Sequence, residues 1–205
     1  MRILEKTERR LGEKLLLKGD RCSGPKCAMT RRNYPPGIHG RRRRRGLSEY
    51  GELLQEKQKV RFLYGLDDHE IEGYVKKAQG RAGLFGANFL SLLERRLDNT
   101  VFRLGLAPSR RIARHLISYR HITVNGKTVS IPSYQVKKEE VIGIREASQI
   151  SPLFAELDAR LKKYDPPKWL RLEKEKRHGI VTGMPEADDA QLTLDVAKIK
   201  EFYMR

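Results

Sequence analysis

The spacing of hydrophobic residues divides the chain into regions of different predicted structure. Residues 1–46 show no sustained period and are interrupted by proline and glycine, so they predict an irregular segment. Between residues 47 and 119, apolar side chains recur every three or four positions, as on one face of an α-helix. Capping residues and glycines separate four predicted helices, over residues 48–64, 67–78, 87–104 and 109–119.

The hydrophobic period changes from helical to alternating after residue 121. Apolar and polar residues alternate from Ile122 to Val129 around Asn125-Gly126, the dipeptide most typical of a tight β-hairpin. Val141–Ile144 is expected to form another strand. Residues 94–146 therefore predict two helices followed by a small curved antiparallel sheet.

The last third of the chain gives weaker patterns. Leu153, Leu157 and Leu161 predict one further helix. Residues 165–170 are expected to be a linker whose Trp169 docks against a neighbouring surface. The apolar residues of 192–203 fit a helix or a strand equally well. Taken together, the elements indicate a mostly helical α+β fold.

The positive charge is concentrated in two stretches that contain no acidic residue. The 205 residues carry a formal net charge of +17, with 43 lysines and arginines against 26 aspartates and glutamates. Residues 21–48 contain nine lysines and arginines and residues 99–138 contain eight, so these stretches account for the whole excess. Because carboxylates repel phosphates, the exclusion of acids predicts two surfaces that lie against a polyanion such as nucleic acid.

The predicted helix 109–119 offers the sharper of the two candidate surfaces. Its arginines fall largely opposite its apolar face, and guanidinium groups bind phosphate through paired hydrogen bonds. Tyr119 or His121 could stack on an unpaired base. A solvated helix face is the alternative, but solvated faces normally mix both signs of charge. The RNA-binding residues expected in this region are Arg96, Arg103, Ser109, Arg110, Arg111, Arg114, His115, Tyr119, Arg120, His121, Asn125 and Lys127.

The basic residues nearer the N-terminus form the second candidate surface. Arg41–Arg45 are five consecutive arginines, which cannot pack in a hydrophobic core. Such a run also occurs in nuclear localisation signals and disordered tails. Its position directly after Tyr34–Gly40 favours an arm that lies along RNA and becomes ordered on binding. The RNA-binding residues expected here are Arg31, Arg32, Tyr34, His39, Arg41, Arg42, Arg43, Arg44, Arg45, Lys57, Lys59 and Arg61.

Several functional classes have no support in the sequence. No apolar run approaches the roughly 20 residues that span a membrane, and the N-terminus lacks the apolar stretch of a signal peptide. Gly126-Lys127-Thr128 resembles the end of a phosphate-binding loop, but His121 occupies the position of the first glycine. No nucleophile motif is recognisable. We therefore expect a cytoplasmic protein that is not an enzyme, takes no small-molecule substrate and binds no membrane.

The two cysteines of the chain, Cys22 and Cys27, are spaced as half of a candidate zinc site. A structural zinc takes four ligands, nearly all of them Cys or His, and His39 is the only nearby candidate for a third. Two reduced thiols with a purely structural role are the alternative. The residues by themselves leave the metal open.

Short segments distributed along the chain carry a family resemblance. They are Leu17–Cys22, Tyr34–Gly40, Leu47–Tyr50, Gln55–Val60, Tyr64–Gly65, Leu92–Asn99, Val124–Gly126 and Pro132–Val136. Over nearly its full length the sequence resembles the bacterial form of the small-subunit ribosomal protein four family. The helix with Leu92–Asn99, the helix that begins at Ser109 and the Val124–Gly126 hairpin resemble the RNA-binding module named after that family.

The resemblance implies a division into three parts and a role in the ribosome. Residues 1–46 would be a basic irregular arm, residues 47–93 with 152–205 a helical domain, and residues 94–151 an inserted small RNA-binding module. Members of this family bind small-subunit rRNA at a junction of its 5′ domain and nucleate assembly of the subunit body. They contact small-subunit protein five, contribute with it to translational accuracy, and line the path by which mRNA enters. Repression of the chain's own operon is left open.

The sequence departs from the family at the cysteines. Family members with a zinc site carry four of them, and Glu5 and Glu8 stand where the first two would fall. The resemblance therefore implies a decayed site without metal, and no other cofactor is expected. Zinc on the remaining pair, Cys22 and Cys27, stays open.

Two other functional classes are considered beside this one. An RNA-modifying enzyme or a tRNA synthetase can carry the same module as an appendage, but the rest of the chain would then need catalytic motifs. A helix-turn-helix DNA regulator built on residues 109–119 would need a dimer element and would accept duplex DNA as a competitor. Neither a catalytic motif nor a dimer element is visible in the sequence.

Overall fold

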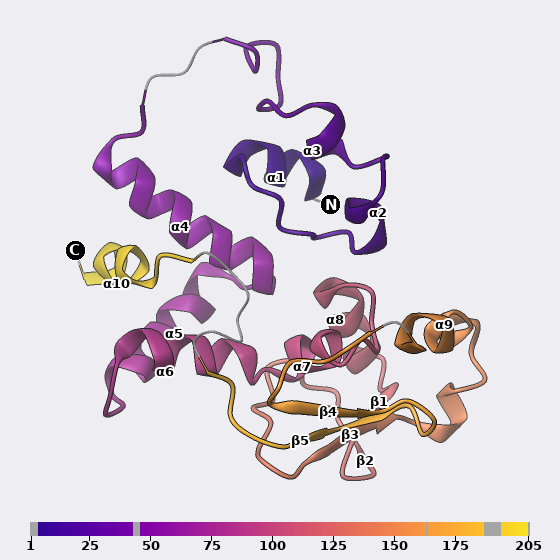
Figure 1. Cartoon of the computed structure of the whole chain (residues 1–205). Coiled ribbons are helices and arrows are strands. Elements are labelled where there is room, and N and C mark those ends of the chain that lie inside the picture. Colours follow the sequence, from indigo (N-terminus) through magenta and orange to yellow (C-terminus); the bar gives the residue numbers. More distant parts are fainter. Residues whose placement is uncertain (1–3, 43–45, 163, 187–193, 205) are drawn as a thin grey trace. The chain divides into compact units, whose positions relative to one another are not determined.

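The computed structural model describes residues 4–42, 46–162, 164–186 and 194–204. The chain forms two compact units, Met1–Lys76 with Leu192–Arg205 and Lys77–Gln191. Figure 1 shows their elements in the order of the chain. The second unit combines helices with an antiparallel sheet, which confirms the predicted mostly helical α+β fold. Among the described residues, no helix is long and apolar enough to cross a membrane.

The first unit is built around its longest helix. The helices are α1 (Leu4–Leu11), α2 (Asp20–Ser23), α3 (Ala28–Arg31), α4 (Glu49–Tyr64), α5 (Asp68–Gln79), which continues into the second unit, and α10 (Val196–Met204). Ser48 caps α4, since its hydroxyl accepts a hydrogen bond from the Gly51 N–H at 3.2 Å. Gly65 ends α4 in the left-handed conformation, with φ 66°. Both ends of this helix are therefore as predicted.

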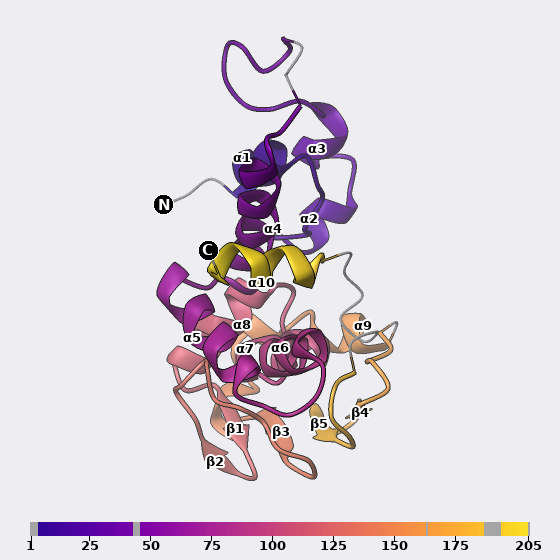
Figure 2. The ribbon, with the colours of Figure 1, turned by 90° about the vertical axis from the view of Figure 1, so that its left-hand side faces the viewer.

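The C-terminal segment, which the sequence left open, is a helix packed on α4. Ile199 of α10 is fully buried, and the Phe202 ring lies 5.9 Å from the Tyr50 ring. Lys198 pairs with Glu52 at 2.8 Å, and Lys57 lies over the Phe202 ring. Figures 1 and 2 show α10 beside α4 from two sides. Contacts with α4 therefore select the helix that the apolar spacing alone did not.

The N-terminal segment is more ordered than its irregular sequence pattern predicted. It contains α1, α2 and α3, and Leu15, Cys22, Cys27 and Met29 are buried within it. The Arg9 guanidinium donates to the carbonyl oxygens of Arg32, Tyr34 and Pro35. Small apolar contacts and side-chain hydrogen bonds to the backbone therefore give shape to a segment that has no hydrophobic period.

The second unit begins with three helices, α6 (Phe85–Glu94), α7 (Leu97–Arg103) and α8 (Arg110–Ser118). The sequence predicted one continuous helix over 87–104, and this is wrong at residues 95 and 96. There the chain leaves the helix and pairs with residues 132–136, where the Leu97 N–H donates to the Tyr134 carbonyl and the Val136 N–H to the Arg95 carbonyl. The helical spacing of apolar residues continues across the break and conceals it.

The sheet has five antiparallel strands in the order β2-β1-β3-β5-β4. They are β1 (Ile122–Val124), β2 (Lys127–Thr128), β3 (Val141–Ile144), β4 (Leu170–Glu173) and β5 (His178–Val181). Asn125 and Gly126 join β1 to β2 with φ angles of 50° and 76°, which confirms the predicted hairpin. In Figures 1 and 2, α7 and α8 lie against one face of this sheet.

The strands β4 and β5 correct the expected place of the described residues between 152 and 186, which the family resemblance implied to be part of the helical domain. Two short 3₁₀ turns, Glu146–Ser148 and Pro152–Phe154, and the helix α9 (Leu157–Lys162) lead back to the sheet. Trp169 is buried in the same core as Leu97 and Ile117, and its expected docking is onto this core. Gly179 of β5 lies so close to Leu104, the residue directly after α7, that a Cβ at this position would clash with the Leu104 side chain. The segment is therefore part of the module's core, and the module ends well beyond residue 151.

Candidate nucleic-acid interface

The helix α8 presents a basic face on a buried support. Its N-cap is Ser109, whose hydroxyl accepts a hydrogen bond from the Ile112 N–H at 3.3 Å. Ala113, Leu116 and Ile117 enter the core of the second unit. Exposed side chains from the rest of the helix and its end are Arg111, Arg114, His115, Tyr119 and Arg120. The helix thus divides as predicted, although Ile112 is 43% exposed and belongs to the outer side.

Arg110 and Tyr119 are the most closely defined members of this face. The Arg110 guanidinium lies 4.5 Å over the Phe102 ring, and its Nε donates to the Asn99 Oδ1 at 2.7 Å. The Tyr119 ring stacks on His115 at 6.2 Å and is 70% exposed. Arg120 follows in the left-handed conformation, with φ 61°. A fixed guanidinium and an exposed aromatic ring are the groups that bind phosphate and stack on an unpaired base.

Of three further residues expected beside this face, His121 and Asn125 have engaged side chains. His121 is half-buried, with Nδ1 3.0 Å from the Ser148 hydroxyl and its ring edge-on to Phe154. The Asn125 Oδ1 accepts a hydrogen bond from the Val141 N–H at 2.8 Å, so this side chain fixes the hairpin to β3. Lys127 on β2 is exposed. Of the two predicted stacking residues, Tyr119 is therefore the one that is open to solvent.

Arg96, Arg103 and Ser109 lie inside the protein, which corrects their assignment to the RNA surface. Arg96 is fully buried and binds the Asp98 carboxylate through Nε at 3.1 Å and Nη2 at 2.7 Å. Arg103 is 6% exposed and binds the fully buried Glu94 carboxylate through two hydrogen bonds of 3.0 Å. Both are buried two-pronged ion pairs that fix the turn between α6 and α7. Charge counting cannot distinguish such arginines from surface ones.

The buried Glu94 carboxylate is connected to the basic face through one side chain. The Asn99 Nδ2 donates to the Glu94 Oε2 at 2.7 Å, and the Asn99 Oδ1 accepts from Arg110. The amide is thereby oriented by Glu94 and orients Arg110 in turn. The position of one candidate phosphate-binding group is therefore set from the core.

The basic residues of α4 are also paired with acids, contrary to the sequence expectation. Lys57 and Lys59 are buried, and Arg61 is half-buried. Lys57 pairs with Asp68 at 2.6 Å and Arg61 with Asp68 at 3.2 Å. Lys59 pairs with Glu13 and Glu56 at 2.5 Å. Burial disfavours the charged form of Lys59, but the two carboxylates outweigh burial and raise its pKa overall. Lys57 and Lys59 are therefore buried ion-pair partners within the first unit.

The end of α3 and the loop after it carry several of the exposed basic residues of the first unit. Arg31, Arg32, His39, Arg41 and Arg42 are exposed, whereas Arg43, Arg44 and Arg45 lie outside the described residues. Two guanidinium groups lie over the Tyr34 ring, Arg9 at 4.8 Å and Arg41 at 5.0 Å from its centroid. A hydrogen bond from Arg41 to the Tyr34 hydroxyl, aided by the positive charge around it, lowers the pKa of Tyr34. Sequence reasoning missed Arg9 because its helix also contains acids.

Cys22 and Cys27 are both buried beside a carboxylate that is already engaged. The Glu8 Oε1 accepts hydrogen bonds from the Leu15 and Leu17 N–H groups at 3.2 Å, and the Cys22 Sγ lies 3.9 Å from Oε2. Burial raises the pKa of Cys22 and also opposes ionisation of Cys27, but hydrogen bonds around Thr30 lower the pKa of Cys27 overall. In the described ranges, no three His, Cys, Asp or Glu side chains gather as metal ligands would. This donor set does not fit a structural zinc.

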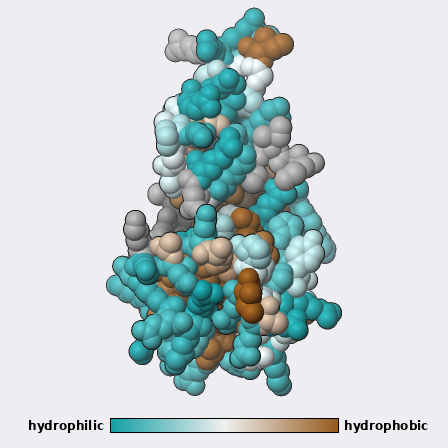
Figure 3. All heavy atoms as spheres, turned by 90° about the vertical axis from the view of Figure 1, so that its right-hand side faces the viewer, coloured by the Kyte–Doolittle hydropathy of each residue, from teal (hydrophilic) through white to brown (hydrophobic). Residues whose placement is uncertain are grey.

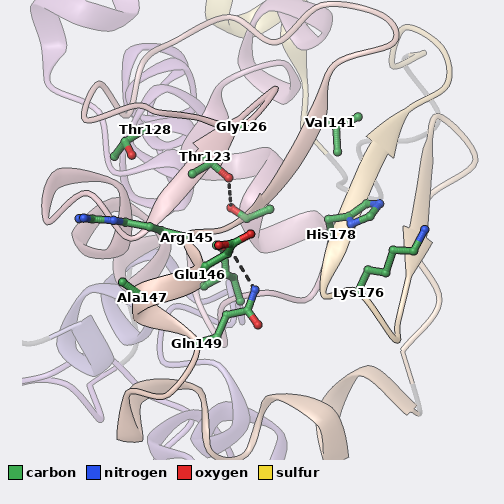
Figure 4. A pocket seen from close by; sticks show the side chains of 12 residues that line it. Thr123, Gly126, Thr128, Val141, Arg145, Glu146, Ala147, Gln149, Lys176 and His178 are labelled. Carbon is green, nitrogen blue, oxygen red and sulfur yellow. Dashed lines mark hydrogen bonds between the residues drawn. The ribbon is translucent and has the colours of Figure 1, made fainter.

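The outer face of the sheet carries a hollow of about 600 Å³, shown in Figure 4. Arg145, Glu146, Lys176 and His178 line it together with the Thr123 hydroxyl, which donates to the Gly143 carbonyl. The hollow mixes both signs of charge, and His178 pairs with Glu173 at 3.2 Å. On the face drawn in Figure 3, hydrophilic residues predominate and hydrophobic ones form small separate groups. The face of α8 therefore remains the better polyanion site of the second unit.

Comparison with known proteins agrees with this geometry. Residues 4–94 match the family model "Ribosomal protein S4/S9 N-terminal domain", and residues 95–142 match the "S4 domain". Similar relatives are named small ribosomal subunit protein uS4. They include proteins of Halothermothrix orenii (48% identity), Caldicellulosiruptor saccharolyticus (47%) and Desulfitobacterium hafniense strain Y51 (46%), each matched over 96% of this chain and 94% of its own length.

These matches define the class first: a ribosomal protein that carries the S4 RNA-binding domain. At this identity and coverage, the chain belongs to the small ribosomal subunit protein uS4 family. The family resemblance drawn from the sequence is thereby confirmed. The family is one of structural ribosomal proteins. This membership favours the ribosomal class over the two alternatives, an enzyme with an appended module and a DNA regulator.

Proposed function

We propose that this chain is a structural protein of the small ribosomal subunit and binds the subunit's rRNA directly. The observation that carries the proposal is the exposed face of α8, where Arg111, Arg114 and Tyr119 stand on a buried support within an acid-free stretch. Phosphate contacts supply the affinity and the shape of the RNA supplies the specificity. The exposed cations of residues 31–42 add a second contact region.

The finer role follows from family membership and the resemblance of the sequence. The chain binds a junction in the 5′ domain early and nucleates assembly of the subunit body. It contacts small-subunit protein five, contributes to translational accuracy there, and lines the path by which mRNA enters. It acts in the cytoplasm on the ribosome, without catalysis and without a metal. The engaged Glu8 carboxylate supports the metal-free state, and unchanged RNA binding after prolonged chelation would test it.

Binding of the full chain to a transcript of the rRNA 5′ domain tests the central claim. We expect binding that survives competition by duplex DNA and by unrelated structured RNA at near-physiological salt. If roughly six phosphates are contacted, affinity falls by about 10³-fold between 50 and 200 mM salt. Displacement by any polyanion would reduce the proposal to non-specific attraction.

The double variant Arg111→Glu with Arg114→Glu locates the surface. Both side chains are exposed, so the fold is retained, and we expect junction binding to fall by at least 100-fold because repulsion replaces two phosphate contacts. Lys168→Glu with Arg171→Glu is the matched control, since it makes the same charge change on exposed residues of the same unit. Equal losses in both variants would move the RNA surface away from α8.

A further inference from the structure

A groove in the first unit combines an apolar floor with a basic rim. It runs between α1 and α4, has a volume of about 580 Å³, and lies within one compact unit. Leu11, Leu54 and Phe62 form the floor, and each of them is only half-buried. The Gln55 amide donates to the Leu11 carbonyl at 2.9 Å and ties the end of α1 to α4. Half-buried apolar side chains in a groove between two helices leave room for a flat apolar group.

The rim of this α1–α4 groove is basic. Lys6, Arg10 and Arg61 line it, and none of the described residues that line it carries a carboxylate. Arg61 is partly neutralised by Asp68, whereas Lys6 and Arg10 are exposed and form no ion pair within the described part of the chain. The ligand that fits has both an apolar face and negative charge.

A second hollow on the other side of α1 extends the basic surface. It has a volume of about 280 Å³ and shares Lys6 with the α1–α4 groove. Arg9, Lys26, Arg31 and Arg32 also line it, together with a single acid, Glu5, which pairs with Lys18 and Arg21. Arg9 then leads to Tyr34 and Arg41. Closely spaced cations on both sides of one helix match the regular charge of a phosphodiester backbone.

We propose that an unpaired nucleotide of RNA inserts its base into the α1–α4 groove while its neighbouring phosphates bind Lys6, Arg10 and the second hollow. The proposal rests on the proposed function and adds a nucleotide site to it. An unpaired base has the apolar faces that the floor needs, whereas a duplex presents phosphates and sugars to a concave surface. An acidic protein segment would satisfy the rim, but the run of cations continuing through the second hollow to Arg41 favours a strand of phosphates.

The double variant Lys6→Glu with Arg10→Glu tests the rim. Both side chains are exposed, so thermal unfolding should not change. We expect weaker binding of the full chain to the 5′ domain transcript. The slope of log affinity against log salt concentration should become shallower by about 1–2, because one or two phosphate contacts are lost. Lys14→Glu with Lys76→Glu makes the same charge change on exposed residues of the same unit and serves as control. Equal losses in the two variants would overturn the site.

Chemical probing of the bound transcript tests the inserted base. We expect one unpaired base to be protected by the wild-type chain, exposed again with Lys6→Glu/Arg10→Glu, and still protected by Arg111→Glu/Arg114→Glu at saturating protein. Failure of α8 variants to affect binding would count against the proposed function, whereas protection unchanged by the rim variant would count only against this site.

A short ligand separates base insertion from simple phosphate binding. We expect a single-stranded oligoribonucleotide to bind the full chain about tenfold more tightly than an abasic oligomer of equal length and charge, since a stacked base contributes that much or more. Equal binding of the two oligomers would overturn base insertion. Displacement of the oligoribonucleotide by an acidic apolar peptide, but not by abasic oligomer, would assign the groove to a protein partner instead.

Discussion

The two acid-free stretches of this chain are shaped by different forces. In residues 99–138 the cations of α8 stand on the hydrophobic core of the second unit, with Arg110 oriented by Asn99 and ultimately by the buried Glu94. In residues 21–48 a few buried side chains and hydrogen bonds to the backbone define the path. Two guanidinium groups share the Tyr34 ring there, although like charges repel each other.

The two stretches illustrate two ways in which a protein can form a positive surface for RNA. On α8 the apolar core fixes the positions of the cations, and the cost of arranging them is met when the protein folds. In the N-terminal segment, bringing cations together is unfavourable until phosphates neutralise them. We therefore expect the second unit to keep its shape without RNA and the N-terminal segment to gain more order from binding.

The largest effect is expected from breaking the buried ion pair between Glu94 of α6 and Arg103 of α7. Glu94→Gln removes the charge that balances Arg103 in a site where both groups are buried, and this should destabilise the second unit by about 3–5 kcal/mol. Urea unfolding followed by Trp169 fluorescence measures this change in the second unit. Glu146→Gln, an exposed change on the same unit, should have little effect. If Glu94→Gln leaves the free energy of unfolding of the second unit unchanged, the contrast drawn between the two acid-free stretches is wrong.

A smaller effect is expected at the aromatic ring of the N-terminal segment. Tyr34→Ala removes the surface on which Arg9 and Arg41 stack, and each such contact at an exposed site contributes about 0.5–1 kcal/mol. Affinity for the 5′ domain transcript should fall several-fold, while urea unfolding of the second unit stays the same. Tyr34→Phe keeps the ring and should bind almost normally. If Phe and Ala weaken binding equally, the hydroxyl that bonds Arg41 matters rather than the ring.

The smallest effect is expected from acid pH on the N-terminal segment. The hydrogen bond from Lys18, helped by Arg21 and opposed by burial, lowers the pKa of Glu5 below its ordinary value of 4.5. Its ion pairs therefore stabilise the folded segment above pH 4.5, and this contribution is lost as the pH falls through the lowered pKa. Amide NMR signals of α1 and α2 should shift in this range, and Glu5→Gln should abolish the shift. An identical acid response in the variant would assign the change to another carboxylate.

Local signals in the sequence predicted local features of the fold. Ser48 and Gly65 as the ends of α4, Ser109 as the cap of α8, and Asn125-Gly126 as a hairpin all depend on residues within one turn of each other. The strands β4 and β5 were missed because β5 pairs with β3, which lies more than 30 residues earlier in the chain, and β4 joins the sheet only through β5. The break before α7 was missed because pairing with residues 132–136 outweighs the helical pattern.

The candidate site divides in the same way. Arg111, Arg114 and Tyr119 were found because a helix with one apolar face exposes the other, and their contact with RNA stays a prediction. Arg96, Arg103, Lys57 and Lys59 carry the same charge but are buried against acids that the charge count does not locate. Lys6, Arg9 and Arg10 were overlooked because acids accompany them along α1, although they line hollows in space.

Residue identity and spacing were enough to predict the class of this protein, the period of most of its helices and the two stretches from which acids are excluded. These properties reside in residue identity and short spacing, which survive without any knowledge of contacts. Only the tertiary structure decided which cations face solvent, where the module ends, and how Glu8 and Glu94 are engaged. Burial and pairing are properties of neighbours in space, and such neighbours can lie far apart along the chain, as Glu52 and Lys198 do.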